Sequence, residues 1–259
     1  MTFSIYLAFI LLALIQGLTE WLPISSSGIL VILEEIYKLE DKNLNLLFNV
    51  SVHTGSLLAV IIYLRKEIFS LSNNIKLFQN IIIATIPVVI IGFIIKFFNF
   101  NLFLQDIKIV TASTIFFSII LYISDKTAVT RKFNKNISNK NSLYIGLSQS
   151  LALIPGTSRS GITITCARFL GFSRKESAKF SFLISIPTLF AATTLGLSDA
   201  VINFNIQTIV FLFIGFFVSL VVSLFCIKLF ISFVEKYSLT LFVIIRLILG
   251  FMLLIYLAN

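Results

Sequence analysis

Six stretches of this chain are long and apolar enough to cross a lipid bilayer as helices. A spanning helix needs roughly 20 mostly apolar residues, and the stretches that qualify are 44–64, 77–95, 107–123, 178–197, 208–227 and 239–257. With 58% hydrophobic and only 12% charged side chains, the chain has too little polar surface to cover a water-soluble globule. The sequence therefore predicts an all-α, multi-pass membrane protein that forms one integral membrane domain over residues 1–259.

Two further apolar regions, residues 3–33 and 143–170, are each interrupted by a polar, helix-breaking segment. The first break is Glu20-Trp21-Leu22-Pro23-Ile24-Ser25-Ser26-Ser27-Gly28, and the second break is Pro155-Gly156-Thr157-Ser158-Arg159-Ser160-Gly161. Unpaired backbone groups are costly in hydrocarbon, so such breaks persist only where protein or a water-filled cavity surrounds them. We therefore predict two re-entrant helical hairpins, whose halves are too short to cross, beside the six transmembrane helices.

The distribution of Lys and Arg predicts the orientation of the chain in the membrane. Six spans and two hairpins divide the loops between two sides, and one side receives most of the 20 cationic side chains: Arg65, Lys66, Lys76, Lys126, Arg131, Lys132, Lys135, Lys140, Arg174, Lys175, Lys179, Lys228 and Lys236. Because cytoplasmic loops are enriched in Lys and Arg, we expect this side to be cytoplasmic and both termini to lie outside. The net charge of +9 then reflects topology and contact with anionic membrane lipids, and we expect no nucleic-acid partner.

The two halves of the chain, residues 1–125 and 141–259, resemble each other weakly and are joined by a basic loop. Pro23 and the serines after it align with Pro155 and the hydroxyl residues after it. The predicted topology gives the halves opposite orientations, which is typical of an inverted-topology repeat. Paired broken helices in such repeats form one site near the middle of the membrane, so we expect Glu20 and Arg159 to lie close together.

Together the two breaks would form a site for a phosphorylated ligand. The candidate binding residues are Ser25, Ser26, Ser27, Gly156, Thr157, Ser158, Arg159, Ser160, Gly161 and Thr163. Helix N-termini attract anions, a guanidinium grips phosphate oxygens in pairs, and glycine permits close backbone approach. At membrane depth, the expected ligand is an amphiphile with a phosphorylated head. Glu20 would serve in proton transfer, in metal coordination or as the partner of Arg159, and each role fits hydrolysis of a phosphate ester or anhydride.

Structural roles stay open for several of these residues. Glu20 and Arg159 could form a buried ion pair that only holds the two hairpins together. Gln16 precedes Glu20 by one helical turn, so it could orient the carboxylate or a ligand, or act as a generic interhelical hydrogen-bonding residue. His53, the one histidine of the chain, lies in a predicted span without a partner in sequence, and we expect a packing or hydrogen-bonding role, with a place in the wall of the site as the less favoured alternative.

Four other residues within apolar segments are expected to be structural. Arg168 and Arg246 would extend toward the interface or satisfy backbone carbonyls. Cys166 and Cys226 show no spacing typical of a zinc site or a disulfide, so we interpret them as small core residues.

With these motifs in place, the chain resembles the bacterial undecaprenyl-diphosphatases, the bacitracin-resistance family of integral membrane phosphatases. Residues 16–28 are similar to the first signature of that family and residues 155–163 to the second; residues 53–59 and 180–187 fit as well. The resemblance implies hydrolysis of undecaprenyl diphosphate to undecaprenyl phosphate and inorganic phosphate, which recycles the lipid carrier for peptidoglycan synthesis and confers bacitracin resistance. It also implies six spans and two hairpins in the bacterial cytoplasmic membrane, with the active site open to the extracytoplasmic side.

The resemblance further implies roles for individual residues. The essential groups would be Glu20, Ser26 and Arg159, and the diphosphate pocket would be lined by Gln16, Ser25, Ser27, Gly156, Thr157, Ser158, Ser160, Gly161 and Thr163. A divalent cation, Mg²⁺ or Ca²⁺, would support activity, with Glu20 as a candidate ligand. This chain departs from the family pattern at Gln16, where many relatives have a second glutamate, and at Ile29, where many have a histidine. A single carboxylate should weaken metal binding by the protein, so the cation could instead arrive bound to the diphosphate.

The nucleophile, the function and the oligomeric state stay open at this point. The nucleophile is either Ser26, activated by Glu20, or a water that Glu20 positions. Broken helices in an inverted repeat are also transporter architecture, so the alternative function is a flippase for polyprenyl phosphate, with or without hydrolysis; a relative that only binds the carrier is a third reading. An apolar face rich in Gly and Ser would support a homodimer, although nothing in the sequence requires one.

Overall fold

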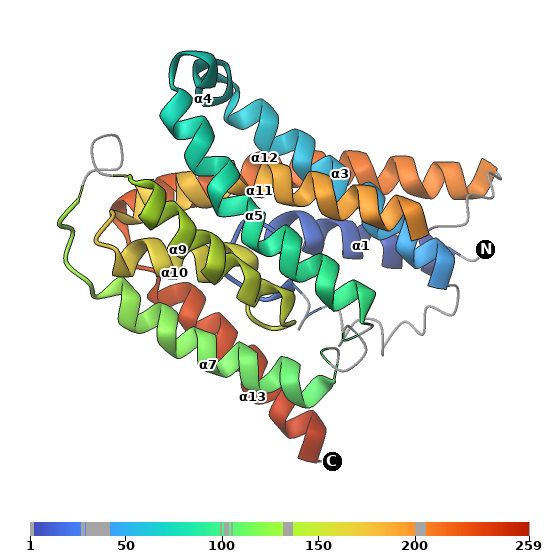
Figure 1. Ribbon diagram of the computed structural model, residues 1–259. Coiled ribbons are helices and arrows are strands. Elements are labelled where there is room, and N and C mark those ends of the chain that lie inside the picture. The colour runs from blue at the N-terminus through green and yellow to red at the C-terminus, as the bar shows by residue number, and fades with distance from the viewer. Residues whose placement is uncertain are drawn as a thin grey trace.

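A computed structural model describes residues 3–26, 29, 42–98, 100, 104, 106–131, 137–199 and 206–258 of the chain. Within this part the chain forms helices and no strand (Figure 1). The helices are α1 (Phe3–Thr19), α3 (Lys42–Tyr63), α4 (Arg65–Phe69), α5 (Ile75–Phe97), α7 (Ile107–Asp125), α9 (Asn139–Ser150), α10 (Arg159–Phe169), α11 (Arg174–Asp199), α12 (Ile206–Lys236) and α13 (Thr240–Ala258). Two 3-10 turns, Ser70–Asn73 and Leu151–Leu153, follow α4 and α9.

The six predicted spans are confirmed as helices long and apolar enough to cross a membrane. They are Asn43–Tyr63, Ile75–Phe97, Ile107–Asp125, Arg174–Asp199, Thr208–Lys236 and Thr240–Ala258. The fifth helix runs past its predicted end at residue 227, because Phe230, Ile231 and Val234 continue its buried face into the main core. The chain is therefore a multi-pass membrane protein.

Both breaks interrupt helices at the predicted places. In the first, α1 ends at Thr19 and the chain turns over residues 20–24; the remainder of this predicted hairpin lies largely outside the described residues. In the second, α9 has 12 residues and α10 has 11, and the two short helices contact each other. A helix rises about 1.5 Å per residue, so each covers only about 18 Å of a hydrocarbon core that is about 30 Å thick.

Close helix contacts position the first break against the rest of the molecule. Helix α3 packs along α12 and α11, and α1 packs on α12 (Figure 1). Small residues permit this approach: a Cβ on Gly55 would lie 2.3 Å from the carbonyl oxygen of Phe216. The buried Ser56 hydroxyl lies 2.9 Å from that of Ser219 and 3.0 Å from that of Ser223, as is typical of helix pairs held by small and hydroxyl residues in membranes.

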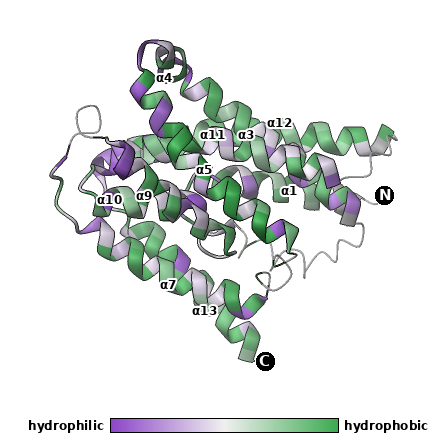
Figure 2. Ribbon diagram, in the orientation of Figure 1, coloured by the Kyte–Doolittle hydropathy of each residue, from purple (hydrophilic) through white to green (hydrophobic). Residues whose placement is uncertain are grey.

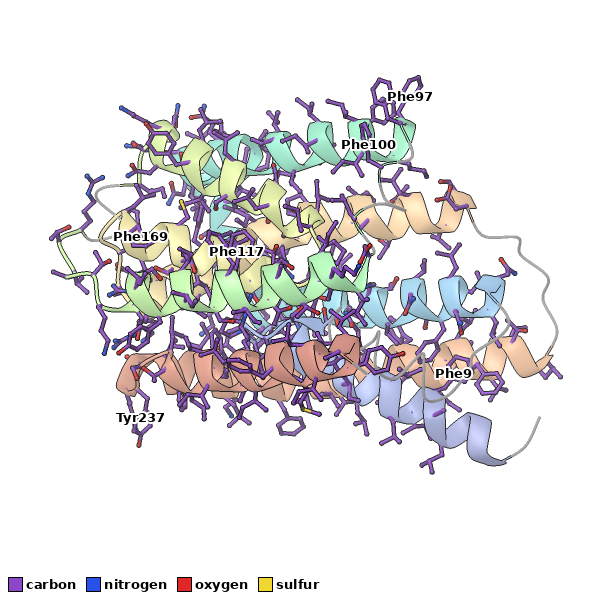
Figure 3. The ribbon with its side chains drawn as sticks, turned by 90° about the horizontal axis from the view of Figure 1, so that it is seen from below. Phe9, Phe97, Phe100, Phe117, Phe169 and Tyr237 are labelled. Carbon is purple, nitrogen blue, oxygen red and sulfur yellow. The ribbon has the colours of Figure 1, made fainter. Side chains whose placement is uncertain are left out.

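Ion pairs join helix ends that the charge pattern assigns to the same side. Arg174 pairs with Asp125 at 2.5 Å, Lys175 with Glu235 at 2.6 Å, and Lys179 with Glu67 at 3.1 Å. Figure 2 shows hydrophilic residues gathered at this end, around α4 and the α10–α11 connection. Lys96 pairs with Asp199 at 2.8 Å at the other end. Figure 3 likewise places Phe97 and Phe100 at the end opposite Tyr237.

Candidate active site

The centre of the site is an ion pair between the two breaks. Glu20 directly follows α1, where its N–H donates to the Gln16 carbonyl at 3.0 Å, and Arg159 is the first residue of α10. Arg159 Nη2 donates to Glu20 Oε1 at 2.5 Å, and the two side chains are 13% and 9% exposed. The predicted proximity of Glu20 and Arg159 is thus observed, over 139 positions of sequence.

The second oxygen of Glu20 is held by an amide from the same helix. Gln16 Nε2 donates to Glu20 Oε2 at 2.8 Å, which is the orienting role suggested by their spacing of one turn. The Gln16 amide oxygen is buried and has no hydrogen-bond partner. Both carboxylate oxygens are therefore engaged, and their positions are fixed by α1 and α10 together.

His53 belongs to this cluster, a position that the sequence offered only as the less favoured alternative. Its Nδ1 atom, presented by α3, lies 3.6 Å from Glu20 Oε2 and 3.4 Å from Gln16 Nε2. The expected hydrogen-bonding role is correct, but the partner is the site itself. The signal in the sequence was a lone imidazole inside an apolar span; its meaning depended on the packing of α3 beside the end of α1.

The Arg159 guanidinium is held from two further directions. Its Nη1 atom donates to the carbonyl oxygen of Ser181 in α11 at 3.4 Å, and its plane lies 5.5 Å from the centre of the Trp21 ring. Trp21 is fully buried and packs edge-to-face on Phe182 at 5.1 Å. A cation over an indole face is stabilised by the ring quadrupole. Ser181 and Trp21 are thus site residues that sequence reasoning did not assign.

The second break reaches its shape through unusual backbone torsions. Ser158 has φ 66° and ψ 114°, and its hydroxyl caps α10 by accepting the Gly161 N–H at 3.3 Å. Gly156 has φ 92°, and a Cβ there would lie 2.2 Å from the Ser113 hydroxyl of α7. A positive φ on a non-glycine residue is costly and occurs mainly at functional sites.

The predicted hydroxyl residues divide into different roles. Ser160 donates to the Leu22 carbonyl of the first break at 2.8 Å, so it ties the breaks together. The Thr163 hydroxyl lies 2.9 Å from the Arg159 carbonyl and 2.7 Å from the Ser181 hydroxyl. Thr157 is fully buried and its hydroxyl has no hydrogen-bond partner.

The serines of the first break are described only in part. Ser25 is buried, with 1% exposure, whereas Ser26 is partly exposed. Ser27 lies outside the described residues. Ile29, the departure from the family pattern, is partly buried and packs against the main apolar core.

The two embedded arginines outside the breaks bind carbonyls. Arg246 of α13 is completely buried and donates to the Gly156 carbonyl at 3.1 Å and to the Pro23 carbonyl at 3.5 Å. Arg168, 3% exposed, donates to the Phe172 carbonyl at 2.5 Å and to the Thr127 carbonyl. The expected bonds to backbone carbonyls are observed for both side chains. Arg246 thereby joins the first break to the second.

The described residues do not fit a cation held by the protein. Among them no three His, Cys, Asp or Glu side chains come together as metal ligands. Glu20 is the one carboxylate in contact with Arg159, and both of its oxygens already accept hydrogen bonds. Hard divalent cations prefer several oxygen ligands, and this cluster offers a single carboxylate.

Comparisons with known proteins agree with the family resemblance of the motifs. A family model described as bacitracin resistance protein BacA matches residues 9–252. The chain is 42% identical over 259 residues to an undecaprenyl-diphosphatase of Pelagibacter ubique (strain HTCC1062), covering 99% of this chain and 100% of the relative. It is 40% identical over 265 residues to an undecaprenyl-diphosphatase of Aliivibrio salmonicida (strain LFI1238), covering 95% of this chain and 96% of the relative.

Proposed function

Because the chain belongs to the bacitracin resistance protein BacA family, we propose that it hydrolyses undecaprenyl diphosphate to undecaprenyl phosphate and inorganic phosphate. The observation that carries this proposal is the buried Glu20–Arg159 pair where the two breaks meet. It joins a phosphate-binding cation to a carboxylate able to move a proton. The product would re-enter peptidoglycan synthesis, and continued recycling would confer bacitracin resistance.

The ion pair defines the resting state of the site. A guanidinium and a carboxylate buried together compensate each other's lost hydration. The terminal phosphate of the substrate presents an alternative anion to Arg159, whose planar fork binds two phosphate oxygens. When the phosphate takes this position, Glu20 loses its strongest partner and becomes available as a base. Substrate binding thus creates the catalytic form of Glu20.

The chemical step follows from these positions. Glu20 removes the proton of the Ser26 hydroxyl, whose oxygen attacks the terminal phosphorus, and the anhydride bond to undecaprenyl phosphate breaks. Water then hydrolyses the phosphoserine and releases inorganic phosphate; direct attack by water on the substrate is the alternative course. Arg159 and the amides of the second break would stabilise the charge that develops on the phosphoryl oxygens, usually the largest catalytic contribution.

The environment of the substrate completes the proposal. The diphosphate would enter from the extracytoplasmic side while its polyprenyl tail stays among membrane lipids between the helices. A divalent cation, Mg²⁺ or Ca²⁺, would arrive bound to the diphosphate, since the described side chains do not form a cage for it.

The decisive experiment measures inorganic phosphate release from a short-chain polyprenyl diphosphate by the detergent-purified protein, with Mg²⁺ or with a chelator. We expect Glu20→Gln and Arg159→Lys to lower turnover by about 10²-fold or more, because each removes a group that acts in the transition state. Size-exclusion profiles and melting curves check that both variants fold. Lys96→Ala, which removes only an exposed ion pair, is the matched control and should release phosphate at the wild-type rate.

A folded wild-type protein that releases no phosphate, either with Mg²⁺ or with a chelator, would contradict the proposed hydrolysis. Movement of undecaprenyl phosphate across reconstituted vesicles without phosphate release would then establish the flippase.

A further inference from the structure

His53 occupies a position from which it can exchange a proton with Glu20. Its Nδ1 atom lies 3.6 Å from Glu20 Oε2, the oxygen that faces away from Arg159. The imidazole side chain is 33% exposed while the Glu20 side chain is 9% exposed. His53 is therefore the more accessible member of this pair, and it is the one histidine of the chain.

The contact between the Gln16 amide and His53 indicates whether the Nδ1 atom of His53 carries a proton. Its nitrogen carries two hydrogens; one is donated to Glu20 Oε2 at 2.8 Å, and the nitrogen also lies 3.4 Å from His53 Nδ1. An amide N–H requires an acceptor, so this contact fits an imidazole whose Nδ1 lone pair is free of a proton. A proton added to Nδ1 would instead be shared with Glu20 Oε2.

We propose that His53 is a positioning residue that also accepts, from Glu20, the proton that the nucleophile gives up. In the step, the nucleophile O–H bond breaks and the proton moves to the Glu20 carboxylate, which the bound phosphate has separated from Arg159, while the new P–O bond forms and the anhydride bond breaks. The proton then passes to His53 Nδ1, which restores the carboxylate and leaves a charged imidazole. The exposed ring loses this proton to water before the next turnover.

Among the described residues, few charged groups lie close enough to His53 to affect this proton transfer. Glu20 faces it directly, and Arg159 acts on it through Glu20. The helices that pack on α3 carry paired charges toward their ends, where Lys179 meets Glu67, Lys175 meets Glu235, and Asp199 meets Lys96. Between these ends, α12 presents Ser219 and Ser223 to α3.

The test compares three variants of α3 in the phosphate-release assay, with and without added imidazole. His53→Asn keeps a polar atom near the position of Nδ1 but cannot carry the proton, and His53→Ala leaves space for added imidazole. Thr54→Val is the matched control, because the Thr54 hydroxyl bonds only to the Val50 carbonyl of its own helix at 2.7 Å.

We expect His53→Asn to lower kcat by about 10²-fold, the usual contribution of a proton-transfer group, with KM close to that of the wild type. Imidazole should restore turnover to His53→Ala in proportion to its concentration, while Thr54→Val should behave as the wild type.

The inference rests on the proposed hydrolysis, and the outcomes separate the two. A wild type without phosphate release overturns the proposed function and this step with it. A working wild type beside a His53→Asn variant with unchanged kcat overturns the role of His53 alone. A slower His53→Asn, with no rescue of His53→Ala by imidazole, also overturns it and assigns His53 to packing.

Discussion

Ser158 carries conformational strain in the backbone of the second break. Its φ of 66° lies where glycine is favoured, and its hydroxyl caps α10 through the Gly161 N–H. Strain of this kind costs roughly 1–3 kcal/mol, whereas replacing a serine cap by alanine costs about 1 kcal/mol and by glycine only a few tenths. The backbone and the side chain of Ser158 therefore contribute to stability with opposite signs.

Two substitutions at Ser158 separate these contributions. We expect Ser158→Gly to match or exceed the wild-type stability, because the relief of strain offsets the weaker cap. Ser158→Ala should be less stable by about 1 kcal/mol, because it keeps the strain and loses the cap. Melting curves of the purified proteins in one detergent check this order, and an alanine variant as stable as the glycine variant would show that the torsion is not strained.

At the scale of elements, α9 of the second hairpin packs closely against α5 at a glycine. A Cβ added to Gly146 of α9 would lie 2.5 Å from the carbonyl oxygen of Ala84 and 2.7 Å from its Cα. These are backbone atoms that cannot rotate away, so Gly146→Ala must push α9 from α5. We expect a loss of about 1–3 kcal/mol, typical of overpacking, measured by thermal unfolding.

Gly92 of α5 provides the matched control for that prediction. A Cβ there would meet only the Leu153 side chain at 3.7 Å, which is ordinary contact. Gly92→Ala should therefore be neutral or stabilising by up to about 1 kcal/mol, since alanine is the better helix former. Equal effects of the two substitutions would contradict the close approach of α9 and α5.

Arg246 links elements that are distant in sequence, because its guanidinium binds carbonyls of both breaks. Arg246→Met would remove the guanidinium bonds to these buried carbonyls, at about 1–3 kcal/mol each, and would let the breaks separate. A misplacement of about 1 Å can cost about 10²-fold in rate, so we expect lower stability together with a loss of phosphate release. Arg246→Lys should retain more stability but little activity, because one ammonium cannot span both carbonyls; wild-type release by Arg246→Met would refute the link.

At the scale of the whole molecule, the ion pairs sort the helix ends into two groups, and the Lys and Arg distribution assigns the richer group to the cytoplasm. Cysteines introduced at two exposed positions test this assignment: Ser72 after α4 and Phe100 after α5. A membrane-impermeant maleimide should label Phe100→Cys in intact cells and Ser72→Cys only after permeabilisation. The unmodified protein, with its two cysteines in apolar segments, is the control, and the reverse labelling would invert the orientation.

The sequence by itself determined the spans and the breaks. The lengths of apolar runs and the positions of Pro23, Pro155 and Gly156 are local properties, because the bilayer thickness and the backbone need for hydrogen bonds act on each segment separately. The weak similarity between the two halves further predicted that Glu20 and Arg159 lie close together. Helix α12 exceeded its predicted end the most, running past residue 227 to Lys236, because burial of Phe230 in the core stabilises the added turns.

The tertiary structure alone decided the partners of the buried polar groups. His53 reaches Glu20 because α3 lies beside the end of α1, and Arg246 reaches two carbonyls because α13 packs on α7 next to both breaks. Ser160 joins the breaks through Leu22, a bond that no spacing predicts. Hydrogen bonds act over about 3 Å, so their partners follow from the packing of helices and not from the hydrophobic pattern that creates those helices.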